Sequence, residues 1–226
     1  MHLIIPIVVI LALVFGPGLW VKHVLRKYGR PEDRYPGTGA EFAKHLLLNL
    51  GLDHVKVEES PVGDHYDPDA KAVRLAPERF NSRSLATVTV AAHEVGHAVQ
   101  DYDGYSAFRA RTFLARSAVF GERLGRILLI GAPIVTLLTR APAAGGLMLL
   151  GVLVSVGLAT IVHLVTLPVE LDASFKRALP MLEKGNYLHD TDMPHARKLL
   201  KAAAFTYVAS SMFSVLNVLR WLRFPR

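Results

Sequence analysis

The sequence of 226 residues contains no cysteine. This absence excludes disulfide bonds, thiolate metal ligands and a cysteine nucleophile, so a metal ion would have to be held by histidine and carboxylate side chains. The basic residues, which give a formal net charge of +7, are not interleaved with aromatic residues but cluster beside apolar runs. That distribution is typical of the loops of a membrane protein, and we expect no nucleic-acid partner.

Charged residues are absent from Leu3 to Val21, a run about as long as a bilayer is thick. The run lacks the preceding basic segment and the small-residue cleavage site of a signal peptide. Trp20 suits the membrane interface, and basic residues follow it at once (Lys22, Arg26, Lys27 and Arg30). This pattern predicts a retained transmembrane anchor, with the chain after it in the cytoplasm.

Three more apolar runs cover residues 127–139, 147–167 and 202–219. Arg140 separates the first two, because a charge in mid-bilayer costs about 2.5–3.5 kcal/mol, and they predict a membrane hairpin. Hydrophobic residues make up 51% of the chain, and its mean hydropathy is +0.31. The predicted fold class is therefore a mainly α membrane protein with about four transmembrane helices.

The most distinctive motif is the pentapeptide His93-Glu94-Val95-Gly96-His97. Residues four apart lie on one face of a helix, about one turn from each other, so both imidazoles can reach a single Zn²⁺. Glu94 is then placed to take a proton from a water at the metal. The alternative is a pair of helix-surface histidines flanking a solvated glutamate.

Two histidines leave a catalytic zinc site incomplete, because such a site has three protein ligands and an open position. Glu170 and Asp172 emerge from the end of the second hairpin run, where an unpaired charge is costly. We expect the longer Glu170 to be the third ligand and Asp172 to hydrogen-bond a ligand histidine. The alternative is that both are solvated at a membrane boundary.

These patterns divide the chain into four predicted parts. They are an N-terminal transmembrane anchor (1–27), a zincin-like catalytic part (36–125), a transmembrane hairpin ending at the third ligand (126–170), and polar helices with a C-terminal transmembrane helix (171–226). In the catalytic part, strands are expected at 55–58 and 72–75, with a turn at 64–69. The helix that carries the motif should begin near Ser82 or Ser84 and end near Tyr102. An exposed edge of this small β-sheet can hold an extended peptide.

Four patterns stand out along the chain, at residues 64–68, 91–101, 164–174 and 196–198 followed by 204–208. These stretches resemble the YugP-type membrane zinc metallopeptidases of bacteria, and the resemblance extends over nearly the whole chain. It implies a neutral zinc metallopeptidase in the cell membrane. The layout is also similar to that of the HtpX and CAAX prenyl proteases, whose later glutamate ligand is followed four residues on by an aspartate. Here Ser174 stands at that place, and Asp172 is the nearest substitute.

The expected function is hydrolysis of peptide bonds in membrane-associated proteins or peptides. One Zn²⁺ is held by His93, His97 and Glu170, with Glu94 as general base. Candidates for stabilising the oxyanion or holding substrate are His65, His163, His195, Arg197 and Tyr207. The expected location is the cytoplasmic membrane, as a multi-pass protein with its catalytic site on the cytoplasmic side.

Two other functions remain open at this stage. One is a zinc-containing membrane scaffold or chaperone-like protein without proteolysis. The other is a zinc amidase that acts on a membrane-proximal, non-protein substrate. A small transporter is disfavoured, because its polar residues would lie in the middle of its spans.

Overall fold

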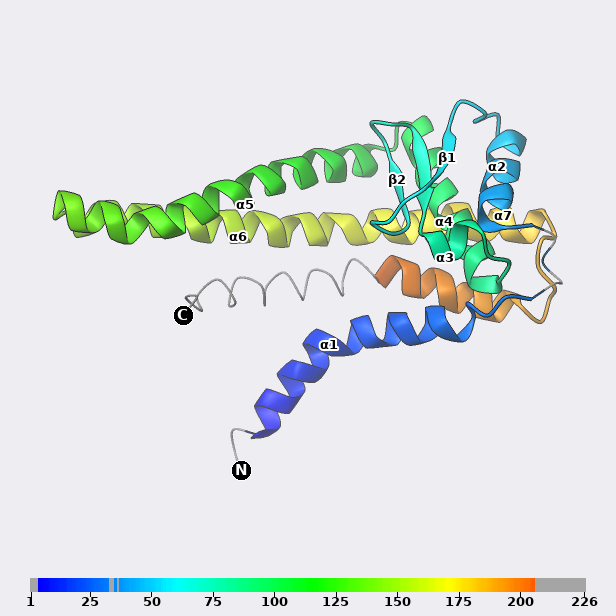
Figure 1. Ribbon diagram of the computed structural model, residues 1–226, viewed down its shortest axis with the longest axis horizontal. Coiled ribbons are helices and arrows are strands. Elements are labelled where there is room, and N and C mark those ends of the chain that lie inside the picture. The colour runs from blue at the N-terminus through cyan, green and yellow to red at the C-terminus, as the bar shows by residue number, and fades with distance from the viewer. Residues whose placement is uncertain (1–3, 33–34, 36, 206–226) are drawn as a thin grey trace.

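Helix α4 (Leu85–Tyr102) lies among a small sheet and several helices, from which a long helical hairpin extends (Figure 1). The computed structural model describes residues 4–32, 35 and 37–205. Its other helices are α1 (Ile4–Lys27), α2 (Gly39–Asn49), α3 (Pro77–Phe80), α5 (Ser106–Thr139), α6 (Pro142–Leu171) and α7 (Leu179–Lys184). A π-helical segment, η1 (Asp172–Ala178), joins α6 to α7, and residues 193–205 are also helical.

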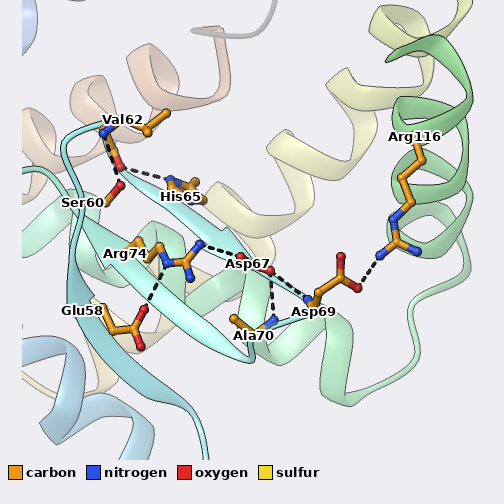
Figure 2. Close-up of polar contacts among 10 residues, drawn as sticks. Glu58, Ser60, Val62, His65, Asp67, Asp69, Ala70, Arg74 and Arg116 are labelled. Atoms are coloured by element: carbon orange, nitrogen blue, oxygen red, sulfur yellow. Dashed lines mark hydrogen bonds and ion pairs between the residues drawn. The ribbon is translucent and has the colours of Figure 1, made fainter. Parts of the chain in front are cut away.

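The sheet contains β1 (Lys56–Glu59), β2 (His65–Asp67) and β3 (Ala72–Leu75) in the order β1-β3-β2. β3 is parallel to β1 and antiparallel to β2. The prediction of a turn over residues 64–69 was wrong in its first half, because residues 65–67 form β2. The chain reverses just after it, where an oxygen of Asp67 accepts the N–H groups of Asp69 and Ala70 (Figure 2).

Local capping determines where two of the helices begin. Thr38 and Glu41 form a reciprocal capping box at the start of α2. The Ser84 hydroxyl accepts the N–H of Thr87 and caps α4. The predicted start and end of the motif-bearing helix are thus confirmed.

The hydrophobic core lies around α4. Val73 and Leu75 of β3, Leu47 of α2, and Leu199 and Leu200 of the last described helix are all fully buried in it. Almost every residue of α4 is buried as well. A helix buried on all sides is held by its neighbours, so its side chains have fixed surroundings.

Helices α5 and α6 lie side by side and form the long hairpin (Figure 1). Arg140, with a positive φ of 54°, ends α5, and Pro142 occupies the first turn of α6. The predicted break at Arg140 is therefore confirmed.

The prediction of about four transmembrane helices was wrong. A span needs about 20 predominantly apolar residues within one helix. Within the residues that the structure describes, no helix combines the length and the apolar character needed to cross a membrane. In α5, for example, Arg109, Arg111 and Arg116 interrupt the first turns. The predicted C-terminal span falls mostly on residues 206–226, outside the described residues. The fold is mainly helical with a small three-stranded sheet.

Candidate metal centre

The two histidines of α4 point to one place. They are four residues apart on the helix, their rings lie 4.7 Å apart between centroids, and both side chains are buried. Glu170, near the end of α6, meets them there. Its Oε2 lies 3.2 Å from Nε2 of His93 and 3.3 Å from Nε2 of His97. Tetrahedral ligands at about 2.0–2.1 Å from Zn²⁺ would be about 3.3 Å apart, so this spacing suits the metal.

His93 is oriented by a serine from η1. The Ser174 hydroxyl donates its single proton to the carbonyl of Leu200, 3.1 Å away. Its oxygen, 3.0 Å from Nδ1 of His93, is therefore the acceptor of an Nδ1–H bond. Because Nδ1 carries the proton, the neutral ring presents the lone pair of Nε2 to Glu170.

His97 is oriented in the same way by a glutamine. The Gln100 amide nitrogen donates to the carbonyl of Val169 at 2.9 Å and to Oδ2 of Asp172 at 2.8 Å. Its Oε1 must then accept from Nδ1 of His97, 2.9 Å away. Nε2 of His97 is thus also left with its lone pair toward Glu170.

This donor set fits a bound cation. Two imidazole lone pairs and a carboxylate oxygen converge in a buried place, and they would repel one another without a positive charge between them. Oε1 of Glu170 is also buried and accepts no hydrogen bond from any residue that the structure describes. In the described part of the chain, His93, His97 and Glu170 are the group whose ligand atoms lie close enough to share a metal.

Close contact between α4 and η1 brings the two halves of the centre together. A Cβ added at Gly96 would lie 2.7 Å from the carbonyl oxygen of Ala173. Any side chain larger than hydrogen at position 96 would therefore push η1, and with it Ser174, away from the histidines. This contact explains the glycine within the motif.

The pKa values of the two glutamates of the site are shifted in opposite directions. Burial raises the pKa of Glu94 to about 8; His93 and Arg111 oppose the shift, while Asp64 and Glu170 add to it. Burial alone would also raise the pKa of Glu170. In the metal-free site, positive charge on His97 and His93 and hydrogen bonds from them outweigh burial and hold that pKa below its ordinary value, and a bound cation would supply the positive charge instead. Glu170 is therefore an anion suited to a metal, and Glu94 is a carboxyl group able to accept and carry a proton.

The other predicted site residues lie in different surroundings. Asp172 reaches His97 only through Gln100, and it also pairs with Arg177 at 3.4 Å. The ring of His65 contacts the carbonyl of Gly63 at 3.0 Å in the loop before β2 (Figure 2).

The remaining oxyanion candidates are not brought to the centre by any contact described. Arg197 is half exposed and pairs with Glu183. His195 stacks on Tyr28, 4.9 Å away between centroids. His163 lies within α6, where its side chain is outside the described part, and Tyr207 also falls outside the described residues.

Three residues at the centre were missed by sequence reasoning. Ser174 stands four residues after Glu170, so the comparison with the HtpX layout had already marked its position. Gln100 lies one turn after His97, and its i, i+3 spacing was a usable signal. Arg111, whose Nη2 is 3.5 Å from Oε1 of Glu170, comes from a different helix and had no local signal.

A family model described as "Putative neutral zinc metallopeptidase" matches residues 3–226. The chain belongs to this family. It is also 33% identical over 215 residues to the "Putative membrane protease YugP" of Bacillus subtilis (strain 168), with 94% of this chain and 91% of that protein covered. No solved structure matches the chain significantly. The family and the donor set together identify Zn²⁺ as the cofactor.

Proposed function

We propose that this protein hydrolyses peptide bonds at a zinc site formed by His93, His97 and Glu170, with Glu94 as general base. The observation that carries the proposal is the convergence of two oriented imidazoles and one carboxylate oxygen beside a buried glutamate. The family description, a zinc metallopeptidase, supports the same chemistry.

Each residue has a defined task in this mechanism. When bound, Zn²⁺ polarises a water and the scissile carbonyl and favours the ionised form of Glu94. The Glu94 carboxylate takes a proton from the attacking water and later gives it to the leaving amine nitrogen. Ser174 and Gln100 keep both imidazoles in the tautomer whose Nε2 is unprotonated.

The substrate is expected to be an extended segment of a protein or peptide. β2 is an edge strand, paired only with β3 in this sheet. Its Tyr66 hydroxyl donates to Asp101 of α4 at 2.7 Å, which ties this edge to the helix that carries the motif. An extended chain added beside β2 would bind through its main chain and accept many sequences.

We also propose that the protein itself binds to a membrane surface and that its substrates are therefore membrane-associated. The relative in B. subtilis is named a membrane protease. Large apolar side chains are exposed along α5 and α6 and give the protein a surface suited to an apolar environment. They include Phe113, Phe120, Ile127, Ile130, Leu137, Leu138, Leu147 and Val154. Co-sedimentation with vesicles of phosphatidylethanolamine and phosphatidylglycerol would test this association, and recovery of all protein in the supernatant would contradict it.

The test of the hydrolytic function is Glu94→Gln. This variant keeps the fold and the metal ligands but has no base, so we expect it to bind zinc normally and lose about 10²–10⁴-fold in turnover of an unfolded protein substrate. Glu59→Gln, the same chemical change at an exposed residue of β1, leaves the ligands and Glu94 intact and is the matched control. Wild-type cleavage by Glu94→Gln would refute the assignment of the base.

The Glu94→Gln variant also distinguishes a peptidase from a scaffold protein that uses zinc only for its structure. If the protein were a scaffold that uses zinc for structure, Glu94→Gln would preserve its biological role. Turnover of acyl amides, with no cleavage in any pool of proteins or peptides, would instead indicate a zinc amidase.

A further inference from the structure

Arg111 reaches the metal centre from α5, next to the third ligand. Its Nη2 lies 3.5 Å from Oε1 of Glu170, and only 16% of its side chain is exposed. Its guanidinium carbon stands over the ring of Phe108, 5.9 Å from the centroid. Phe108 is itself buried, and its ring centroid is 6.0 Å from that of His97. The guanidinium is thus held on a ring that packs against a ligand histidine.

The two oxygens of Glu170 have different neighbours. Oε2 faces the Nε2 atoms of His93 and His97. Oε1 is turned toward Arg111 and accepts no hydrogen bond from the described residues. A carboxylate with one oxygen drawn to a fixed cation offers only the other to a metal.

Other cations close to the centre are paired with other carboxylates. Arg177 forms ion pairs with Asp103 and Asp172. Arg79 pairs with Asp64 at 2.5 Å. Among the described residues, Arg111 is the cation whose ion pair is with a metal ligand.

We propose that Arg111 is a positioning residue that holds Glu170 as a one-oxygen ligand. By keeping Oε1 away from the metal, it preserves the open coordination position that a catalytic zinc needs for water and the scissile carbonyl. The proposal rests on the proposed function only in the choice of ligands. It does not depend on the identity of the substrate.

The test uses the full-length protein with Arg111→Gln and Arg111→Lys. Arg116→Gln is the matched control, because Arg116 lies on the same helix but pairs with Asp69 in the turn after β2 (Figure 2). Zinc affinity is measured by competition with a chelator. The visible absorption of the Co²⁺-substituted protein reports coordination number, since four-coordinate Co²⁺ absorbs much more strongly than five-coordinate Co²⁺.

We expect Arg111→Gln to weaken zinc binding by about 10–100-fold. Its Co²⁺ absorption should fall, because Glu170 can then bind through both oxygens. Arg111→Lys should recover part of the affinity, since the charge remains, but not the absorption, because an ammonium is not held in place on the Phe108 ring as the planar guanidinium is. Arg116→Gln should match the wild type in both measurements.

Wild-type affinity and absorption in Arg111→Gln would overturn the proposal. If Arg111→Gln does not fold, as judged by circular dichroism, Arg111→Lys decides: reduced Co²⁺ absorption supports the proposal, and wild-type absorption overturns it. Both measurements are made without substrate. If the protein does not hydrolyse peptides, the result for Arg111 is therefore unaffected. If the wild-type protein does not bind zinc, the proposed function is overturned instead.

Discussion

Helix α4 and the α6–η1 junction each supply half of the metal centre, and they depend on local structure to different degrees. On α4, His93, Glu94 and His97 are brought together by a single helical turn. On the other half, Glu170 and Ser174 lie more than 70 residues further along the chain and reach the histidines only through packing. The first half forms as soon as α4 is helical, whereas the second requires the complete fold.

The hydrogen bonds that orient the two histidines connect these two halves. His97 is held by Gln100 from its own helix, and that glutamine is anchored to Val169 and Asp172. His93 is held by Ser174 from η1. The α4 half thus contains the two histidine ligands, whereas their orientation depends on contacts with the later half.

The largest expected effect comes from the ligand of the second half. Glu170→Ala should reduce zinc affinity by more than about 100-fold, beyond the 10–100-fold typical of losing a hydrogen-bonding partner of a ligand. Asp172→Asn, which keeps Glu170 in place, should stay within that range. Chelator competition on both variants checks this, and the opposite ranking would make Asp172 the ligand.

The next largest losses of zinc affinity are expected from changes at Gln100 and Ser174, which orient the two ligand histidines. Gln100→Ala removes three hydrogen bonds at once and should lower zinc affinity toward the upper end of a 10–100-fold range. Ser174→Ala removes the one acceptor of His93 and should fall toward the lower end. Isothermal titration with Zn²⁺ measures both. Equal losses would mean that the two histidines are held alike.

Packing between the halves can be disturbed without touching a polar group. Gly96→Ala should destabilise the protein by about 1–3 kcal/mol, because the new methyl group would meet the carbonyl of Ala173. Gly146→Ala, in α6 with nothing within 4 Å of the new Cβ, is the control and should stabilise by about 0.5–1 kcal/mol. Urea unfolding of the metal-free proteins compares them. A stabilising Gly96→Ala would show that the close contact is not needed.

The last expected effect is a pH dependence of stability in the metal-free protein, where Glu94 and Glu170 act in opposite directions. Because the pKa of Glu94 is raised from 4.5 to about 8, the folded state binds more protons than the unfolded state between these values. Stability from this group is full below about pH 4.5 and is lost as pH rises to about 8, by at most about 1.4 kcal/mol per pH unit. Glu170, whose pKa is lowered, acts oppositely: its contribution is present above about pH 4.5 and is lost as pH falls.

Comparing wild type with Glu94→Gln isolates this dependence. Thermal unfolding without metal at about pH 5 and about pH 8 should show that wild type loses more stability than the variant. An identical loss in both proteins would mean that Glu94 is ionised in the folded state throughout.

Prediction from sequence succeeded where a feature is local. The serine cap at Ser84 and the end of α4 at Tyr102 follow from a cap followed by a buried helix. Prediction failed where the surroundings decide. Residues 65–67 read as a turn, yet they pair with β3 and become a strand. Apolar runs were taken as transmembrane spans, and in the described part of the chain no helix meets that requirement.

The four-residue spacing of His93 and His97 was enough to predict that two imidazoles share one helical face with Glu94 beside them, because that spacing fixes their direction once the helix forms. The sequence also indicated Glu170 as the residue to complete the set. Only the tertiary structure decided how each ligand is oriented. Ser174, Gln100 and Arg111 act through hydrogen bonds and an ion pair between separate elements, and such contacts exist only after α4, α5 and η1 have packed together.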